Sequence, residues 1–316
     1  MSHITQTITL TSDQHYGRRL PSGALGQALR AIPAAVERSI SMAFRGRSRV
    51  RGPRPGWLQA AADIRFIDHL GDDASILVFE VPRLGDVAPE LYRRQEFFWS
   101  SHPGPDDTGF DLLGDVLTDV ANRDENSDRY DPPLLRRLAA FRIVLDRGFD
   151  EMRIIGHRYT ADRPARLTRE TVTSARELYC RRLMAQRVRI VGILDRIRAS
   201  TQAFTLKLED GEEVQGVLAE GDIGTLEDLF RRPVLVLGRA VYRAAGHVLR
   251  IEADEIQPAT DRDRFFVTLP RPRRRRLDMR DSLREQGHKK GVGAILGQWP
   301  GDETDDAIEQ ALEEMS

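Results

Sequence analysis

The sequence has little that would support metal or disulfide chemistry, and it has no strong excess of either charge. A single cysteine, Cys180, permits no internal disulfide and no cysteine-based zinc site. No apolar run approaches the roughly 18 residues that span a bilayer, and the first residues lack the pattern of a secretion signal. The 48 basic and 49 acidic residues leave a net charge of −1, which excludes a uniformly basic nucleic-acid binder. We therefore expect a cytoplasmic protein that makes no membrane contact.

Common enzyme motifs are also missing. There is no G-x-x-x-x-G-K-[ST] phosphate loop, no G-x-S-x-G elbow and no H-E-x-x-H pair, and the seven histidines are dispersed. Asp111, Asp115 and Asp119 share one predicted helical face, which is typical either of a Mg²⁺ site or of a charged face in solvent. The solvent-facing interpretation is favoured because no other ligand type is paired with them in spacing. The sequence predicts no cofactor, no catalytic residue and no metal ligand.

The first 185 residues mix helical and strand patterns. Apolar spacings of three and four predict a helix from Ser22 to Phe44, with two pieces or a kink at Pro33. Further helices are expected at 110–120 and 134–145, and at 167–179 with Thr168 as the N-cap. Strands are expected at 62–70 and 74–81, joined as a hairpin by Gly71-Asp72-Asp73, and at 152–155. This pattern indicates a mixed α+β domain whose topology stays open.

Residues 186–258 show the clearest pattern. Alternating apolar residues predict strands at 187–198, 204–208, 214–218, 234–243 and 248–253, with a short helix at 221–230. Three strands, a helix and two strands is the order of an OB-like five-stranded β-barrel, although a small α+β sheet domain has the same order. The barrel could bind single-stranded nucleic acid, but its few aromatics and its acidic turn favour a protein-contact or spacer role.

Residues 259–316 have the composition of a flexible C-terminal tail. The segment 271–290 holds nine basic and three acidic residues, whereas 302–316 holds seven acids and no base. A dense arginine cluster can neutralise phosphates, so a nucleic-acid contact and a solvated linker are both open readings for it. The predicted nucleic-acid-binding residues are Arg271, Arg273, Arg274, Arg275 and Arg276.

The last twenty residues carry the most specific pattern. Thr304 can cap a helix whose first turn holds Asp305 and Asp306, where carboxylates favour the helix dipole. The apolar residues beyond it form one narrow edge, which is typical of a segment that folds into a partner's groove. Docking back onto the chain's own domains is the alternative. The predicted partner-binding residues are Ile295, Leu296, Trp299, Ile308, Leu312 and Met315.

The run Ile295-Leu296-Gly297-Gln298-Trp299-Pro300-Gly301-Asp302-Glu303-Thr304-Asp305, with the final Ala311-Leu312-Glu313-Glu314-Met315-Ser316, resembles the C-terminal tail of bacterial antitoxins paired with PIN-domain ribonuclease toxins. The resemblance covers about twenty residues. It implies a tail that wraps a toxin protein and blocks its acidic, Mg²⁺-dependent site. The chain lacks the small DNA-binding dimerisation module with which such antitoxins begin.

Three functional hypotheses follow from these patterns. The first is a non-enzymatic, antitoxin-like protein that neutralises a toxin nuclease through residues 295–316, with 271–290 contacting nucleic acid or the toxin. The second is a nucleic-acid-binding protein that uses the barrel and the arginine cluster. The third is an enzyme whose site lies in residues 1–185, with Asp111, Asp115 and Asp119 as candidates.

Overall fold

The structure is a computed structural model that describes residues 3–49, 54–93, 102–198, 201–218, 223–270 and 272–274. These residues belong to one compact unit, Met1–Arg274. They form an α+β fold with a closed five-stranded barrel, as the sequence predicts. None of the helices in these ranges is long and apolar enough to cross a membrane.

The N-terminal region, described here as residues 3–182, is built on a five-stranded antiparallel sheet of order β2-β3-β1-β4-β5. Its strands are β1 (His3–Thr11), β2 (Arg65–Leu70), β3 (Ser75–Pro82), β4 (Glu151–Ile155) and β5 (Ala165–Thr168). The predicted hairpin is confirmed, with Gly71 at φ 109° in its turn, a conformation that favours glycine. The central strand β1 was not predicted, although Ile8 and Leu10 alternate into the core.

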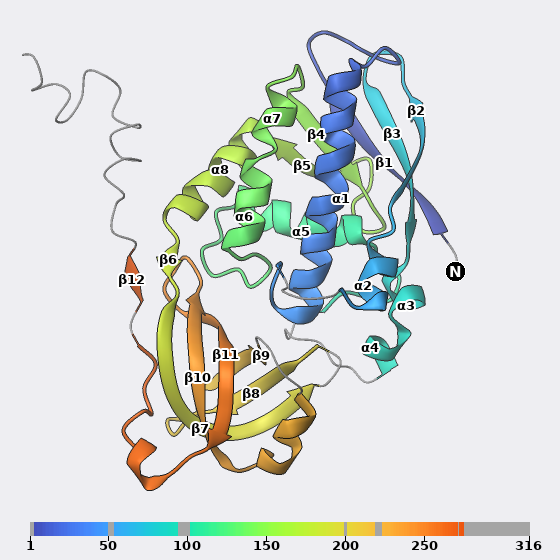
Figure 1. Cartoon of the computed structure of the whole chain (residues 1–316). Coiled ribbons are helices and arrows are strands. Elements are labelled where there is room, and N and C mark those ends of the chain that lie inside the picture. Colours follow the sequence, from blue (N-terminus) through green and yellow to red (C-terminus); the bar gives the residue numbers. More distant parts are fainter. Residues whose placement is uncertain are drawn as a thin grey trace, which may run out of the picture. The chain divides into compact units, whose positions relative to one another are not determined.

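Helices lie together on one face of this sheet (Figure 1). They are α1 (Ser22–Arg45), α2 (Gly56–Ala61), α3 (Leu84–Val87), α4 (Pro89–Arg93), α5 (Gly109–Ala121), α6 (Pro132–Ala139), α7 (Arg142–Leu145) and α8 (Arg169–Cys180). Thr108 and Thr168 begin α5 and α8 with capping boxes, in which the N-cap hydroxyl and a side chain one turn later satisfy free backbone N–H groups. The predicted role of Thr168 is therefore confirmed.

Two helix predictions differ from the structure. The helix expected from Ser22 to Phe44 is one element, α1, which runs through Pro33, so the expectation of two separate pieces is wrong. Proline removes one backbone hydrogen bond, but Ile32 and Val36 on either side are fully buried and hold the helix in the core. The helix expected at 134–145 is divided into α6 and α7 at Ala140–Phe141.

The barrel contains β7 (Gln186–Arg198), β8 (Ala203–Lys207), β9 (Glu213–Leu218), β10 (Pro233–Tyr242) and β11 (Val248–Pro258). The strands close in the order β10-β11-β9-β8-β7, with β9 and β11 parallel and the other pairs antiparallel. The helical turn η1 (Ile223–Leu229) lies between β9 and β10. The predicted order of three strands, a helix and two strands is confirmed, and the barrel is OB-like.

Residues beyond β11 continue along the barrel rather than leaving it at once. A short turn, η2 (Asp261–Asp263), is followed by a segment in which the Phe266 carbonyl accepts a hydrogen bond from the Val191 N–H. The Tyr242 hydroxyl donates to the Pro270 carbonyl, and Leu269 packs against the barrel core. The polar composition of this stretch predicts a tail from residue 259, but its backbone carbonyls at Phe266 and Pro270 accept hydrogen bonds from β7 and β10.

Gly216 leaves room for a buried aromatic ring in the barrel. It pairs across the strands with Phe204, and a Cβ at position 216 would lie 2.1 Å from the ring Cζ. We expect Gly216→Ala to lower the free energy of unfolding by about 1–3 kcal/mol, because the ring is buried and cannot move aside without strain. Denaturant titration of the full chain measures this loss.

Gly26→Ala is the matched control for this substitution. Gly26 lies inside α1, where an added Cβ meets no heavy atom within 4 Å, so this change should stabilise the chain by about 0.5–1 kcal/mol. A shift of both variants in the same direction would contradict the assigned packing around Phe204.

Candidate functional site

The predicted partner-binding residues Ile295, Leu296, Trp299, Ile308, Leu312 and Met315 lie outside the described residues. Of the predicted nucleic-acid-binding arginines, Arg271, Arg275 and Arg276 also lie outside them. Arg273 and Arg274 form the short strand β12, which pairs antiparallel with β6 (Leu183–Met184). The two residues thus sit beside the link between α8 and the barrel.

The three aspartates of α5 do not form a solvent-facing row, so that interpretation is wrong. Asp111 is completely buried and Asp119 is 9% exposed. The Asp111 carboxylate accepts hydrogen bonds from Thr108 in the capping box and from the Arg158 N–H. Asp119 accepts hydrogen bonds from the Ser127 hydroxyl and the Arg129 guanidinium. These carboxylates tie loops to α5, because each receives a donor from a segment that lies elsewhere in the chain.

Arg158 is the centre of this network. Its Nε lies 3.0 Å from Asp107 Oδ1, and its Nη2 lies 2.6 Å from Asp115 Oδ2. Burial by itself would lower the pKa of Arg158, but the hydrogen bond and attraction of Asp115, with Asp107 and Asp111, raise it overall. Burial raises the pKa of Asp107, while the Gly104 N–H and Arg158 oppose that rise. Arg158 is therefore held as a cation between two carboxylates.

A small pocket opens between α1 and α5 beside this network. Its polar lining comes from His102, Asp107, Asp115, Arg129 and Arg158. Arg158 pairs with Asp107 and Asp115, and Arg129 pairs with Asp119, so the charges around the pocket compensate one another. Among the residues that the structure describes, no group of three or more His, Cys, Asp or Glu side chains could hold a metal ion. The pocket thus presents paired charges to any ligand.

At one end of its second and third strands, the barrel face that OB domains use for oligonucleotides packs against the N-terminal region. Ala203 of β8, Val217 of β9 and Leu249 of β11 are buried in the same apolar core as the helices of that region. In the turn between β10 and β11, the Ala245 N–H donates to the Glu125 carbonyl. This face therefore serves as an internal contact of the Met1–Arg274 unit.

A buried ion pair joins the same two parts of the unit. Arg250 of β11 directs Nη2 to Asp131 Oδ2 at 3.2 Å, with side chains that are 4% and 0% exposed. Asp131 also caps α6 through the Leu134 N–H and accepts hydrogen bonds from the Ser48 N–H and hydroxyl. Glu252, 2.7 Å from Arg250 Nη2, supplies a second carboxylate. The sequence did not single out this pair, because its members lie far apart in the chain.

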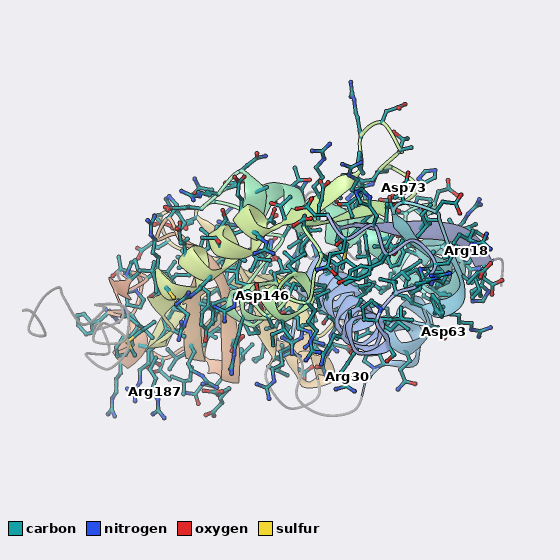
Figure 2. All side chains as sticks on the ribbon, turned by 90° about the horizontal axis from the view of Figure 1, so that it is seen from above. Arg18, Arg30, Asp63, Asp73, Asp146 and Arg187 are labelled. Carbon is teal, nitrogen blue, oxygen red and sulfur yellow. The ribbon has the colours of Figure 1, made fainter. Side chains whose placement is uncertain are left out.

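A shallower groove lies on the other side of the barrel. Its lining includes Arg187, Arg189, Asp254 and Phe266. The Arg189 guanidinium lies 5.8 Å from the centre of the Phe266 ring, within the range of a cation–π contact. Figure 2 shows nitrogen- and oxygen-tipped side chains interspersed over the visible surface, with Arg187 toward one end and Arg18 and Asp73 toward the other. Side chains of both signs are therefore mixed over the visible surface of the described residues.

No protein-family model matches this chain, and no curated protein or solved structure matches it. What the fold defines is an α+β protein in which an OB-like barrel contacts a helical and sheet region through residues of β8, β9 and β11. Its function is argued from its own residues.

Proposed function

We propose that this chain is an antitoxin-like protein that binds and neutralises a toxin nuclease through residues 295–316. The observation that carries the proposal is the apolar edge of Ile308, Leu312 and Met315 at helical spacing, in a stretch whose other side chains are largely acidic. An edge this narrow cannot fold alone, so it gains stability only against a partner's apolar groove.

The resemblance of 295–305 and 311–316 to antitoxin tails supports a partner of the PIN-domain ribonuclease class. Such a toxin has an acidic, Mg²⁺-dependent site, which a wrapping segment would close to RNA. The barrel supports a scaffold role, because one end of its usual oligonucleotide face is covered by the N-terminal region. The barrel then acts as a scaffold for the partner-binding segment.

Deletion of residues 295–316 is the direct test. The truncated chain should show the same circular dichroism spectrum and thermal unfolding from residues 3–274 as the full chain. It should lose capture of the toxin and protection from toxicity when a PIN-domain toxin from the same genome is co-expressed. The readouts are co-purification after nuclease treatment of the lysate, growth, and the Mg²⁺-dependent ribonuclease activity of the captured protein. Full capture by the truncated chain would show that the antitoxin proposal is wrong.

A further inference from the structure

A strongly basic groove lies between α1, α6 and the end of α8. Figure 1 shows α6 placed between α1 and α8. Five arginines line the groove, together with Tyr179 and the two prolines that begin α6: Arg38, Arg49, Arg136, Arg137 and Arg182. They come from four separate stretches of the chain, so no single basic run in the sequence reveals them.

These five arginines have no acidic partners in the described part of the chain, where none of them lies within 4.0 Å of a carboxylate oxygen. Other surface arginines behave differently: Arg54 pairs with Glu37 at 3.0 Å, and Arg142 pairs with Asp146 at 3.3 Å. The nearby Glu37 is therefore already paired, and Asp131 is engaged by Ser48 and Arg250. Among the described residues, the five guanidinium groups of the groove therefore have no ion-pair partner.

Several of the guanidinium groups are held in fixed positions. Arg38 Nη1 donates to the Pro133 carbonyl at 2.8 Å, and Arg182 Nη1 donates to the Tyr179 carbonyl at 2.9 Å. Arg182 also lies 3.9 Å from the centre of the Tyr179 ring and covers one face of it. Arg137 contributes an Nε that is buried without a hydrogen-bond partner. Because these side chains are already ordered, binding of an anion costs less side-chain conformational entropy.

The crowding of like charges has a cost that an anion would relieve. Burial lowers the pKa of Arg38, and the neighbouring cations of Arg137 and Arg49 lower it further, while Asp131 and Glu37 oppose them. Folding thus brings these cations together against their mutual repulsion. The planar guanidinium fork matches the paired oxygens of a phosphate better than an ammonium does.

We propose that this groove binds the phosphodiester backbone of a nucleic acid. The contacts are to phosphates rather than to bases, since Arg182 already covers one face of the only aromatic ring among the groove residues. Binding is therefore independent of base sequence. The groove is built from other residues than 295–316 and Arg271–Arg276, so this proposal is tested independently of the toxin-binding proposal.

The test uses the full chain and the double variant Arg49→Gln/Arg136→Gln. Both side chains are exposed and make no ion pair within the described residues, so the variant should fold normally. Affinity is measured by fluorescence anisotropy with labelled 20-nucleotide single-stranded RNA, single-stranded DNA and duplex DNA over a range of salt concentrations. The three probes show which nucleic acid supplies the backbone.

Loss of two phosphate contacts should reduce the slope of log affinity against log salt by about 1.4 on single strands or 1.8 on duplex DNA. At 0.1 M salt this corresponds to a rise in Kd of roughly 25- to 60-fold, with the curves converging toward 1 M salt. Any contribution of Arg271–Arg276 is present in both proteins and cancels in the comparison.

The matched control is Arg18→Gln/Arg163→Gln, which removes the same charge from two exposed arginines outside the groove. Its slope should equal that of the unchanged chain. The proposal is overturned if the chain binds none of the three probes, if the groove variant keeps its slope, or if the control loses as much. It is also overturned if polyglutamate of equal charge displaces the probe as well as unlabelled nucleic acid does.

Discussion

Asp131→Ala is expected to lower the free energy of unfolding by about 3–5 kcal/mol, because it removes the fully buried carboxylate from the pair and leaves the buried Arg250 cation with Glu252 alone. One buried nitrogen of Arg250, Nη1, already has no hydrogen-bond partner. The substitution also removes the contact that Nη2 makes with Asp131. The change also removes the N-cap of α6, which is worth about 0.5–2 kcal/mol. Glu252 remains 2.7 Å away and offsets part of the lost charge, which places the expected loss toward the lower end.

Two further variants separate the charge from the other roles of Asp131. Asp131→Asn keeps a cap acceptor but loses the charge, so it should be less harmful than alanine. Arg250→Met in the Asp131→Ala background removes the stranded cation and should recover much of the loss, because replacing a buried pair with apolar groups is often neutral. The measurement is the urea midpoint and slope of each full-length variant. A loss below about 1 kcal/mol for Asp131→Ala would contradict the assigned role of the pair.

Trp299→Ala/Leu312→Ala is expected to raise the Kd for the toxin by between about 100- and 10,000-fold. Each large apolar side chain contributes roughly 1.5–3 kcal/mol when it is fully buried, and 1.4 kcal/mol is a factor of ten in affinity. Ordering the segment costs about 2–5 kcal/mol of the gross gain, so the loss of two anchors leaves little net binding. Titration calorimetry with the purified toxin measures the change.

Glu309→Gln/Glu313→Gln is the control for that measurement. The two acids lie between the apolar positions and should set association rate and orientation more than affinity. This variant should bind more slowly at low salt, with a Kd close to that of the unchanged chain. If the acidic pair matters more than the apolar pair, charge rather than apolar burial drives the contact, and the helix-in-groove interpretation is wrong.

The barrel could be predicted because its signals are local. Alternating apolar residues define each strand, and turns such as Asp210-Gly211 define the connections. The order of the strands and the short helix along the chain therefore follows without knowledge of distant contacts. The cap at Thr168 has the same origin, since the hydroxyl bonds to the N–H three residues away. The strand β1 carries its own alternation in Ile4, Ile8 and Leu10, which is the signal that would have revealed it.

The burial of the charged residues could not be predicted from local signals in the same way. Helical spacing places Asp111, Asp115 and Asp119 on one face, but only the approach of residues 156–159 and 127–129 decides that this face is covered. Gly156 permits that approach, because a Cβ there would lie 2.6 Å from the Asp111 carboxylate. The spacing itself is the same for a solvated face and for a buried one.

The sequence by itself determined the positions of most helices and strands, the OB-like order of the barrel, and the charge division between 271–290 and 302–316. Only the tertiary structure decided that Ala203 and Val217 of the barrel join the N-terminal core, that Asp131 meets Arg250, and that five dispersed arginines line one groove. The reason is physical. Backbone periodicity and capping act over a few residues, whereas the desolvation and pairing of a charge depend on side chains that folding brings from elsewhere in the chain.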